Sequence, residues 1–161
     1  MSGIRYPVSG KKKNRKNGVR YPVPGVREKS FKLVLLTSKS LQMGNFRTLR
    51  VWQIAMDLAV KVYSLTRQGD LSKDYGLRDQ LQRSAVSIPS NIAEGDEMGT
   101  SKMAIRQFYI AKGSAAELIT QLTIATRIGY LDQQEIDEMI DVCNKIGAML
   151  NKLIDARTIQ Q

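Results

Sequence analysis

The sequence predicts an all-α protein, an antiparallel up-down-up-down four-helix bundle, preceded by a basic N-terminal tail that we expect to be disordered. In four segments after Met43, apolar residues recur at intervals of three and four, as they do on one face of an α-helix. Short polar or glycine-containing stretches separate these segments, and short connections favour antiparallel neighbours. No segment after Met43 alternates between apolar and polar residues as a β-strand does.

The composition is that of a globular protein with one domain. The chain has 161 residues, of which 42% are apolar and 25% charged. No apolar run approaches the roughly eighteen residues that span a bilayer. The apolar run from Leu33 to Leu36 is too short for the core of a secretory signal. We therefore expect a cytoplasmic protein with no membrane contact.

The residue types that are missing argue against enzyme chemistry. The chain has no histidine, which is the usual general base and the commonest metal ligand. Its single cysteine, Cys143, excludes an intrachain disulfide and a zinc site built from cysteines. We expect no catalytic residue, no metal and no cofactor.

The net charge of +10 lies entirely in the tail. Residues 1–42 hold eleven Lys or Arg and one acid, whereas residues 43–161, the expected bundle, hold fourteen of each. Within the bundle, residues 43–92 hold seven basic and four acidic side chains, a net of +3, and residues 93–161 hold seven and ten, a net of −3. Halves of opposite sign can meet head to tail, and such a contact makes a ring when it closes.

The tail, residues 1–42, contains a short repeat, since GIRYPVSG at Gly3–Gly10 returns as GVRYPVPG at Gly18–Gly25. Its Gly, Pro and Lys content predicts disorder. One interpretation is a basic arm that folds on nucleic acid, with tyrosines stacked on bases. Its phosphate contacts would be Lys11, Lys12, Lys13, Arg15 and Lys16. The favoured interpretation is translated upstream sequence, because Met43 directly precedes GNFRTLRVW, where the helical pattern begins.

The first helix is expected to begin near Phe46 and to end before Gln68, Gly69 and Asp70. Its apolar stripe is Val51, Ile54, Leu58, Val62 and Leu65, widened by Trp52, Ala59 and Tyr63.

The second helix is expected to begin at about Tyr75 and to pass through Pro89. Its stripe is Leu77, Leu81, Ala85, Ile88 and Ile92. An interior proline removes one backbone hydrogen bond and costs about 3 kcal/mol, so we expect a kinked, continuous helix. Short polar side chains beside the proline can bond the carbonyls that it leaves free, namely Ser87, Ser90 and Asn91. Gly95 and Gly99 are expected to mark the following turn.

The third helix has an unbroken heptad pattern after a cap at Thr100 or Ser101. Its core positions are Ala104, Phe108, Ala111, Ala115, Leu118, Leu122 and Ala125. Four of these seven are alanine, and Gly113 and Ser114 lie beside them. Because small side chains let a neighbouring backbone come close, we expect the tightest helix contact here.

The fourth helix is expected to follow Gly129, with Asp132 as N-cap and Glu135 as its capping-box partner. Its stripe is Ile136, Ile140, Cys143, Gly147, Leu150 and Ile154. Cys143 therefore points inward, and we interpret it as an inert, buried thiol.

Two stretches, SIPSNIAEG at Ser87–Gly95 and GSAAELITQL at Gly113–Leu122, resemble the protein family named after the intervening sequences of bacterial 23S ribosomal RNA genes. The resemblance runs from about Phe46 to Ile154 and also covers FRTLRVWQIAMDLAVKVYSLT and LTIATRIGYL. That family is similar to the accessory protein of diversity-generating retroelements. The resemblance implies a four-helix bundle, assembly into ring-forming homopentamers and no assigned reaction. The positions that match the family signature are Ser87, Pro89, Asn91, Glu94, Gly95, Gly113 and Glu117.

Four carboxylates, Glu94, Asp96, Glu97 and Glu117, raise the question of a di-iron site. Such sites use Glu-x-x-His on helices, and histidine is absent. We interpret Glu94 and Glu117 as polar groups that form hydrogen bonds near the proline or pair with arginine, and Asp96 and Glu97 as a solvated helix end.

Basic side chains on the first two helices can form a surface for a phosphate backbone. They are Arg47, Arg50, Lys61, Arg67, Arg78 and Arg83. The alternative is an ordinary surface of mixed charge. The function that we expect is a non-enzymatic homo-oligomer that binds structured RNA or an RNA–DNA hybrid and presents it to a partner such as a reverse transcriptase. A protein-interaction scaffold that never touches nucleic acid is the alternative.

Overall fold

A computed structural model describes residues 44–159 of the chain. The predictions for the basic tail, residues 1–42, lie outside this range. Within it the elements are, in order, η2 (Phe46–Thr48), α2 (Arg50–Leu65), η3 (Asp70–Ser72), α3 (Tyr75–Glu97), α4 (Ser101–Arg127) and α5 (Gln133–Thr158). No strand occurs between residues 44 and 159.

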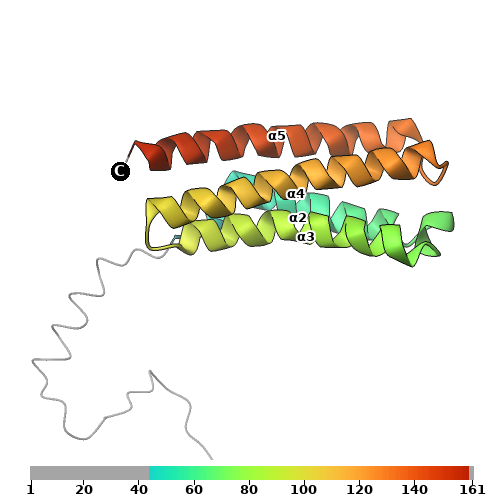
Figure 1. Cartoon of the computed structure of the whole chain (residues 1–161), viewed down its shortest axis with the longest axis horizontal. Coiled ribbons are helices and arrows are strands. Elements are labelled where there is room, and N and C mark those ends of the chain that lie inside the picture. The colour runs from blue at the N-terminus through green and yellow to red at the C-terminus, as the bar shows by residue number, and fades with distance from the viewer. Residues whose placement is uncertain (1–43, 160–161) are drawn as a thin grey trace, which may run out of the picture. The chain divides into compact units, whose positions relative to one another are not determined.

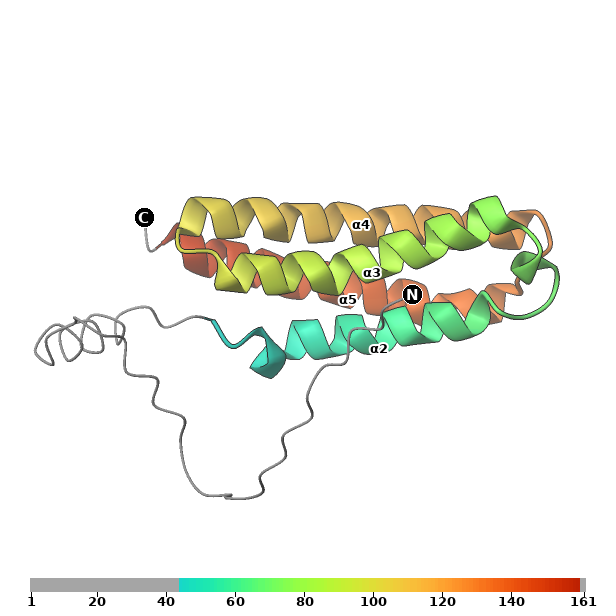
Figure 2. The ribbon, with the colours of Figure 1, turned by 90° about the horizontal axis from the view of Figure 1, so that it is seen from below.

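The four α-helices lie side by side as a bundle (Figures 1 and 2). Helix α3 packs against α2 and α4, α4 also packs against α5, and α2 against α5 closes the arrangement. The α2–α3 and α4–α5 connections are at one end of the bundle and the α3–α4 connection is at the other (Figure 1). The predicted up-down-up-down bundle is confirmed. None of the helices in the described part of the chain is long and apolar enough to cross a membrane.

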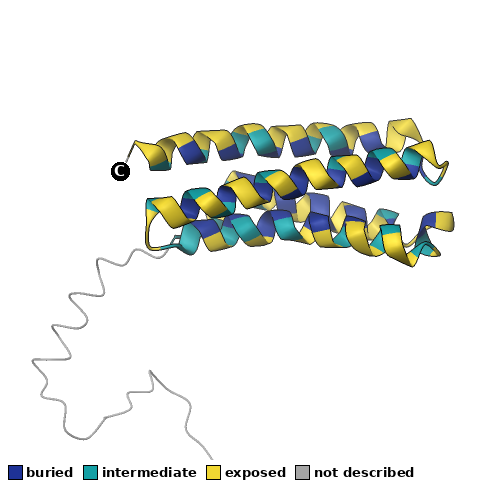
Figure 3. Cartoon of the chain, viewed as in Figure 1, coloured by how far each residue is buried: buried dark blue, intermediate teal, exposed yellow. Residues whose placement is uncertain are grey.

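The core is a continuous apolar column, seen as the inward-facing buried positions in Figure 3. All seven predicted core positions of α4 are buried. In α2 the prediction was wrong in part, because Ala55 is buried while Ile54 and Leu65 are half-buried and Tyr63 is exposed. An α-helix turns by about 100° per residue, so a side chain one position away from the true core position points to the edge of the core instead of into it.

Helix α5 shows the same error of phase. Met139 and Ile146 fill the core, whereas Ile140 and Gly147, which we expected there, are only half-buried. Cys143 is buried, as predicted.

Helix α3 continues through Pro89, as predicted, and changes direction along its length (Figure 2). The Ser90 hydroxyl donates to the Val86 carbonyl at 2.9 Å, and the Asn91 amide donates to the Ser87 carbonyl at 2.8 Å. The carbonyl that Pro89 leaves free is that of Ala85, four residues back. The side chains beside the proline therefore reinforce the next two carbonyls rather than replacing the lost bond.

Gly95 does not mark a turn, because α3 runs on to Glu97. A Cβ atom at Gly95 would lie 2.5 Å from Cε1 of Phe108, and the position is buried. The glycine lets the Phe108 ring of α4 pack directly on the α3 backbone. Gly113 does not have this role within the chain, since it is exposed and a Cβ there would meet no heavy atom within 4 Å.

The predicted helix ends are largely confirmed. The side chain of Thr100 accepts from the backbone N–H of Met103 at the start of α4. At its end, Gly129 has a φ of +83°, and the N–H groups of Gly129 and Tyr130 bond back to the carbonyls of Thr126 and Ala125. This is a Schellman motif, which requires a left-handed residue and favours glycine. The capping box of Asp132 and Glu135 begins α5.

Candidate nucleic-acid interface

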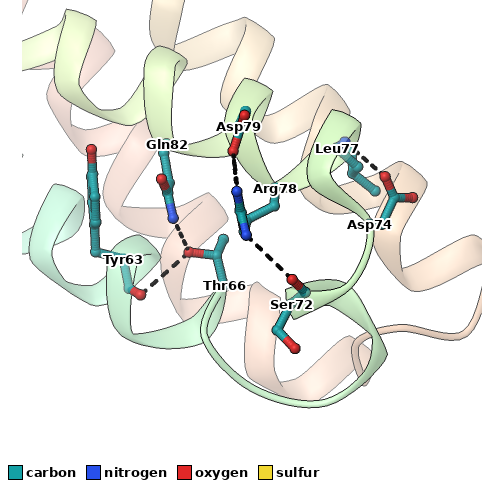
Figure 4. A network of polar contacts seen from close by, with 8 residues as sticks. All are labelled: Tyr63, Thr66, Ser72, Asp74, Leu77, Arg78, Asp79 and Gln82. Carbon is teal, nitrogen blue, oxygen red and sulfur yellow. Dashed lines mark hydrogen bonds and ion pairs between the residues drawn. The ribbon is translucent and has the colours of Figure 1, made fainter.

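An open polar pocket of about 380 Å³ lies where α2 meets α3, beside the connection between them. Figure 4 shows this end of the two helices. The pocket contains two cationic side chains and no carboxylate among its lining residues, which are Tyr63, Thr66, Arg67, Ser72, Arg78 and Gln82. An open pocket with this lining favours an anionic ligand, although the Asp79 carboxylate beside it pairs with Arg78 and offsets one of the two charges.

Arg78 is held in place by three kinds of contact. Its Nε and Nη2 donate to Asp79 Oδ1 at 3.0 and 2.8 Å, and its Nη1 donates to the Ser72 carbonyl at 3.4 Å (Figure 4). Its guanidinium carbon lies 4.6 Å from the centre of the Tyr75 ring. A guanidinium fixed in this way loses little freedom when it binds a ligand.

Thr66, a buried residue of the pocket lining, connects the two helices by hydrogen bonds. Its hydroxyl donates to the Tyr63 carbonyl at 3.3 Å and accepts from Nε2 of Gln82 at 2.8 Å (Figure 4). The chain then turns at Gly69, where φ is +56°, before Asp74 caps α3 by accepting from the Leu77 N–H. Glycine suits this turn because other residues rarely adopt a positive φ.

The six basic residues of the predicted surface do not gather into one patch. Arg67 and Arg78 meet at the pocket, and Arg83 is exposed further along α3. Lys61 pairs with Glu138 of α5. Arg50 begins α2, at the end of the helix away from the pocket, and the sixteen residues of α2 span about 24 Å. Arg47 lies just before α2, above the Phe46 ring. The polar pocket is the place where two of the six come together.

Three of the signature residues, Ser87, Asn91 and Gly95, lie on the interface between α3 and α4, whereas Pro89 lines the side of α3 toward α2 and Gly113 is exposed. The hydroxyls of Ser87 and Ser114 are 2.8 Å apart, and Nδ2 of Asn91 donates to Oγ of Ser87 at 3.0 Å. One turn away the Ser84 hydroxyl donates to Oε1 of Gln121 at 2.7 Å. We call these five hydrogen-bonded residues the α3–α4 polar network.

The signature carboxylates bond to glutamine and not to arginine. Glu117 accepts from Nε2 of Gln121 at 2.9 Å, and Glu94 accepts from Nε2 of Gln107 at 3.1 Å. The prediction of hydrogen bonding was therefore right for both, and the alternative of pairing with arginine was wrong. Sequence reasoning missed the glutamines because buried glutamine has no motif of its own. The one signal was that Gln121 and Ser84 sit directly beside core positions.

Asp96 and Glu97 are not a solvated helix end. The Asp96 side chain is only 11% exposed and accepts from Arg157 near the end of α5 at 3.4 Å. Oε2 of Glu97 is buried. The chain passes close by at Gly44, where a Cβ atom would collide with the Asp96 carboxylate. Two segments distant in sequence therefore cover the end of α3.

No group of three or more His, Cys, Asp or Glu side chains among residues 44–159 is arranged to hold a metal ion. Burial raises the pKa of the Cys143 thiol to about 12. Since the thiolate is the reactive form, this thiol is inert at neutral pH.

A second, apolar depression runs between α2 and α3, with a volume of about 570 Å³. We call it the α2–α3 groove. Phe46 and Trp52 lie at one end, where their ring centres are 5.2 Å apart in an edge-to-face contact. Tyr63 and Arg67 lie at the other end, next to the polar pocket. Its remaining lining residues are Met56, Ala59, Val60, Ser64, Val86, Pro89, Ser90 and Ala93.

Comparison with known proteins finds a matching family and similar solved structures. A family model described as the 23S rRNA-intervening sequence protein matches residues 47–152. A crystal structure of a protein of unknown function, from the S23 ribosomal protein family of Bacteroides thetaiotaomicron VPI-5482, is similar with a TM-score of 0.60. The two sequences are 22% identical over 65% of this chain and 97% of that one, so this similarity shows the fold alone. No curated protein matches the chain.

Proposed function

The chain belongs to the 23S rRNA-intervening sequence protein family, and from this premise we propose that it is a non-enzymatic homo-oligomer that binds the phosphate backbone of structured RNA. The polar pocket carries the proposal, because it places Arg67 and Arg78 beside the hydroxyl-bearing Tyr63 and Ser72 with no acid among its lining residues. Arginine binds phosphate through a planar fork of donors, and such contacts give affinity without reading sequence.

The proposal extends to the assembly and its partners. In a ring of identical subunits, the weak affinities of several pockets combine into a stronger one. Binding of one phosphate raises the effective concentration of the next phosphate of the same RNA at a neighbouring pocket. A homopentamer, an RNA–DNA hybrid as ligand and a reverse transcriptase as partner follow from the resemblance to the accessory proteins of diversity-generating retroelements. Absence of catalysis is part of the proposal, and a turnover abolished by Glu94→Gln or Glu117→Gln would contradict it.

The test is RNA binding across a range of salt, with the mass of the oligomer determined in parallel. We compare the full chain with two variants. The pocket variant is Arg67→Ala/Arg78→Ala, and the tail variant has alanine in place of Lys11, Lys12, Lys13, Arg15 and Lys16. The slope of log K against log salt is negative, and each lost phosphate contact makes it less steep by about one unit. We expect the pocket variant to lose about two units of slope and the tail variant to keep measurable affinity.

The matched control is Lys145→Ala/Lys152→Ala, which removes the same charge from exposed positions of α5. It should leave the slope nearly unchanged. Equal losses in the pocket and control variants would mean that net charge alone binds RNA. Loss of all binding in the tail variant would place the activity in the tail.

A protein-interaction scaffold is the second candidate, and the exposed apolar lining of the α2–α3 groove favours it. A scaffold predicts that heparin or polyphosphate fails to displace the bound partner. Displacement by either polyanion would exclude this candidate.

A further inference from the structure

Two side chains, Tyr63 and Arg67, line both the polar pocket and the α2–α3 groove. Tyr63 lies in the last turn of α2, and Arg67 lies just after the end of that helix. Tyr63 is 36% exposed, and Arg67 is exposed as well. An aromatic ring and a guanidinium group therefore border the same open space.

The two arginines of the pocket differ in their contacts. Arg78 is bonded to the Asp79 carboxylate and to the Ser72 carbonyl, which hold its guanidinium group in place (Figure 4). Within residues 44–159, Arg67 forms no ion pair. The pocket therefore combines one oriented guanidinium group with one whose charge no described carboxylate offsets. Both can donate to a phosphate.

The α2–α3 groove continues from Tyr63 as an apolar surface. Met56, Val60 and Val86 line it and are between 38% and 61% exposed. Arg67 is the one charged residue among the lining residues of the groove. An apolar and partly aromatic surface therefore lies directly beside a cationic pocket.

An RNA nucleotide carries the matching chemistry in one unit. Its base is a flat ring system, and the phosphates on either side of its sugar are anionic. Proteins that bind single strands stack bases on exposed aromatic rings, next to cationic side chains that follow the backbone. A peptide helix in the groove would reach the pocket only with an acidic side chain at its end, whereas every nucleotide carries both groups.

We propose that the Tyr63 ring stacks on the base of an unpaired RNA nucleotide, while Arg67 and Arg78 bind the phosphates beside that base. This inference rests on the phosphate binding of the proposed function and names the part of the RNA that the site takes. A base in a duplex is covered on both faces by its neighbours, so the site selects loops, bulges and ends of a structured RNA. Stacking uses a ring face that every base has, so little sequence preference is expected.

The test compares three RNA ligands, with affinities measured by fluorescence anisotropy. One is a single strand of about ten nucleotides that cannot pair with itself, the second is an abasic strand of the same length, and the third is the duplex of the same sequence. The abasic strand keeps every phosphate, so a difference between the two single strands reports contacts to bases. We expect the wild type to bind the intact strand about fivefold or more tightly than the abasic strand.

Full-length variants then assign the base contact to one side chain. Tyr63→Leu keeps an apolar side chain with good helix propensity but has no aromatic face, and Tyr63→Phe keeps the ring. Tyr109→Leu is the matched control, because Tyr109 lies on α4, is 55% exposed and has Nζ of Lys112 5.7 Å from its ring centre.

We expect Tyr63→Leu to bind the intact strand about fivefold or more weakly than the wild type does. Its affinity for the abasic strand and for the duplex should not change, because neither offers a free base. Tyr63→Phe and Tyr109→Leu should match the wild type with all three ligands.

Crosslinking of the wild type gives an independent result should Tyr63→Leu unfold. Under ultraviolet light, a single strand that contains iodouracil bonds to an aromatic side chain stacked on that base. After digestion with trypsin, the crosslinked peptide should be residues 62–67, in which Tyr63 is the single aromatic residue. The tyrosines of the tail lie in other tryptic peptides, so contacts made by the tail are told apart.

Other results would overturn the inference. If the wild type binds the intact and abasic strands equally, no base is bound. The phosphate binding of the proposed function would then stand, and the groove would be left to the apolar partner of the scaffold candidate. If Tyr63→Leu loses as much affinity for the duplex as for the intact strand, or if the crosslink lies outside residues 62–67, Tyr63 does not stack on an unpaired base. A wild type that binds none of the three ligands would remove both the inference and the proposed function.

Discussion

At the scale of single residues, the glycines of the bundle have opposite roles. Gly95 is buried under Phe108, and a Cβ atom there would collide with the ring. Gly113 in α4 and Gly147 in α5 have no neighbouring atom within 4 Å of a built Cβ. Sequence alone did not reveal these roles, because the pattern predicted a turn at Gly95 and a local pattern says nothing of the space around Gly113 or Gly147.

Alanine at Gly113 or Gly147 should raise the free energy of unfolding by about 0.5–1 kcal/mol, because glycine is the poorer helix former and both positions have space. Urea titration of each variant beside the wild type measures the change. A lower free energy of unfolding in either variant would mean that the added methyl group collides with a neighbour.

Cys143 gives the protein a defined response to alkaline pH. Its pKa is raised from 9.0 to about 12 by burial, so between these values the unfolded thiol ionises while the folded one stays protonated. The unfolded state then binds fewer protons, and stability falls as pH rises above about 9. Urea titrations at pH 8 and pH 11 should show a smaller loss for Cys143→Ala than for the wild type. An equal loss in both would assign the alkaline destabilisation to other groups.

At the scale of helices, the α3–α4 polar network fixes how these two helices meet. The Ser84 hydroxyl and the Gln121 amide are both buried and bonded to each other. A buried acceptor that loses its donor costs about 1–3 kcal/mol, whereas removal of both partners together costs much less. The network therefore disfavours any other register of α3 against α4.

A double-mutant cycle tests this role. Ser84→Ala should lower the free energy of unfolding by about 1–3 kcal/mol, because it leaves Oε1 of Gln121 without this donor. Adding Gln121→Leu should recover part of the loss, and the interaction energy should exceed 0.5 kcal/mol in magnitude. Thermal and urea unfolding give the four values. Strict additivity would mean that the two residues act independently.

At the scale of the whole molecule, the bundle is neutral, yet its surfaces are not uniform. The polar pocket lies at the α2–α3 connection, whereas exposed apolar side chains lie along the bundle on α2, α3 and α4. Because the polar pocket and the exposed apolar side chains are largely different residues, mutation can remove the proposed phosphate contacts and leave the apolar surface intact.

The sequence by itself determined what depends on local order along the chain. The four helices, the Thr100 and Asp132 caps, the end of α4 at Gly129 and the α4 core follow from periodicity and from the chemistry of helix ends. These are interactions between residues within about one or two turns, so their spacing in the sequence is their spacing in space.

Only the tertiary structure decided which side chains meet across helices. Asp96 meets Arg157, 61 residues away, and Ser84 meets Gln121, 37 residues away. It also divided the six predicted basic residues between the pocket, the opposite end of α2, an ion pair with α5 and, for Arg83, an exposed position on α3. The physical reason is rotation about the helix axis. Each residue turns the helix by about 100°, so a contact between two helices depends on the phase of both and on their relative height.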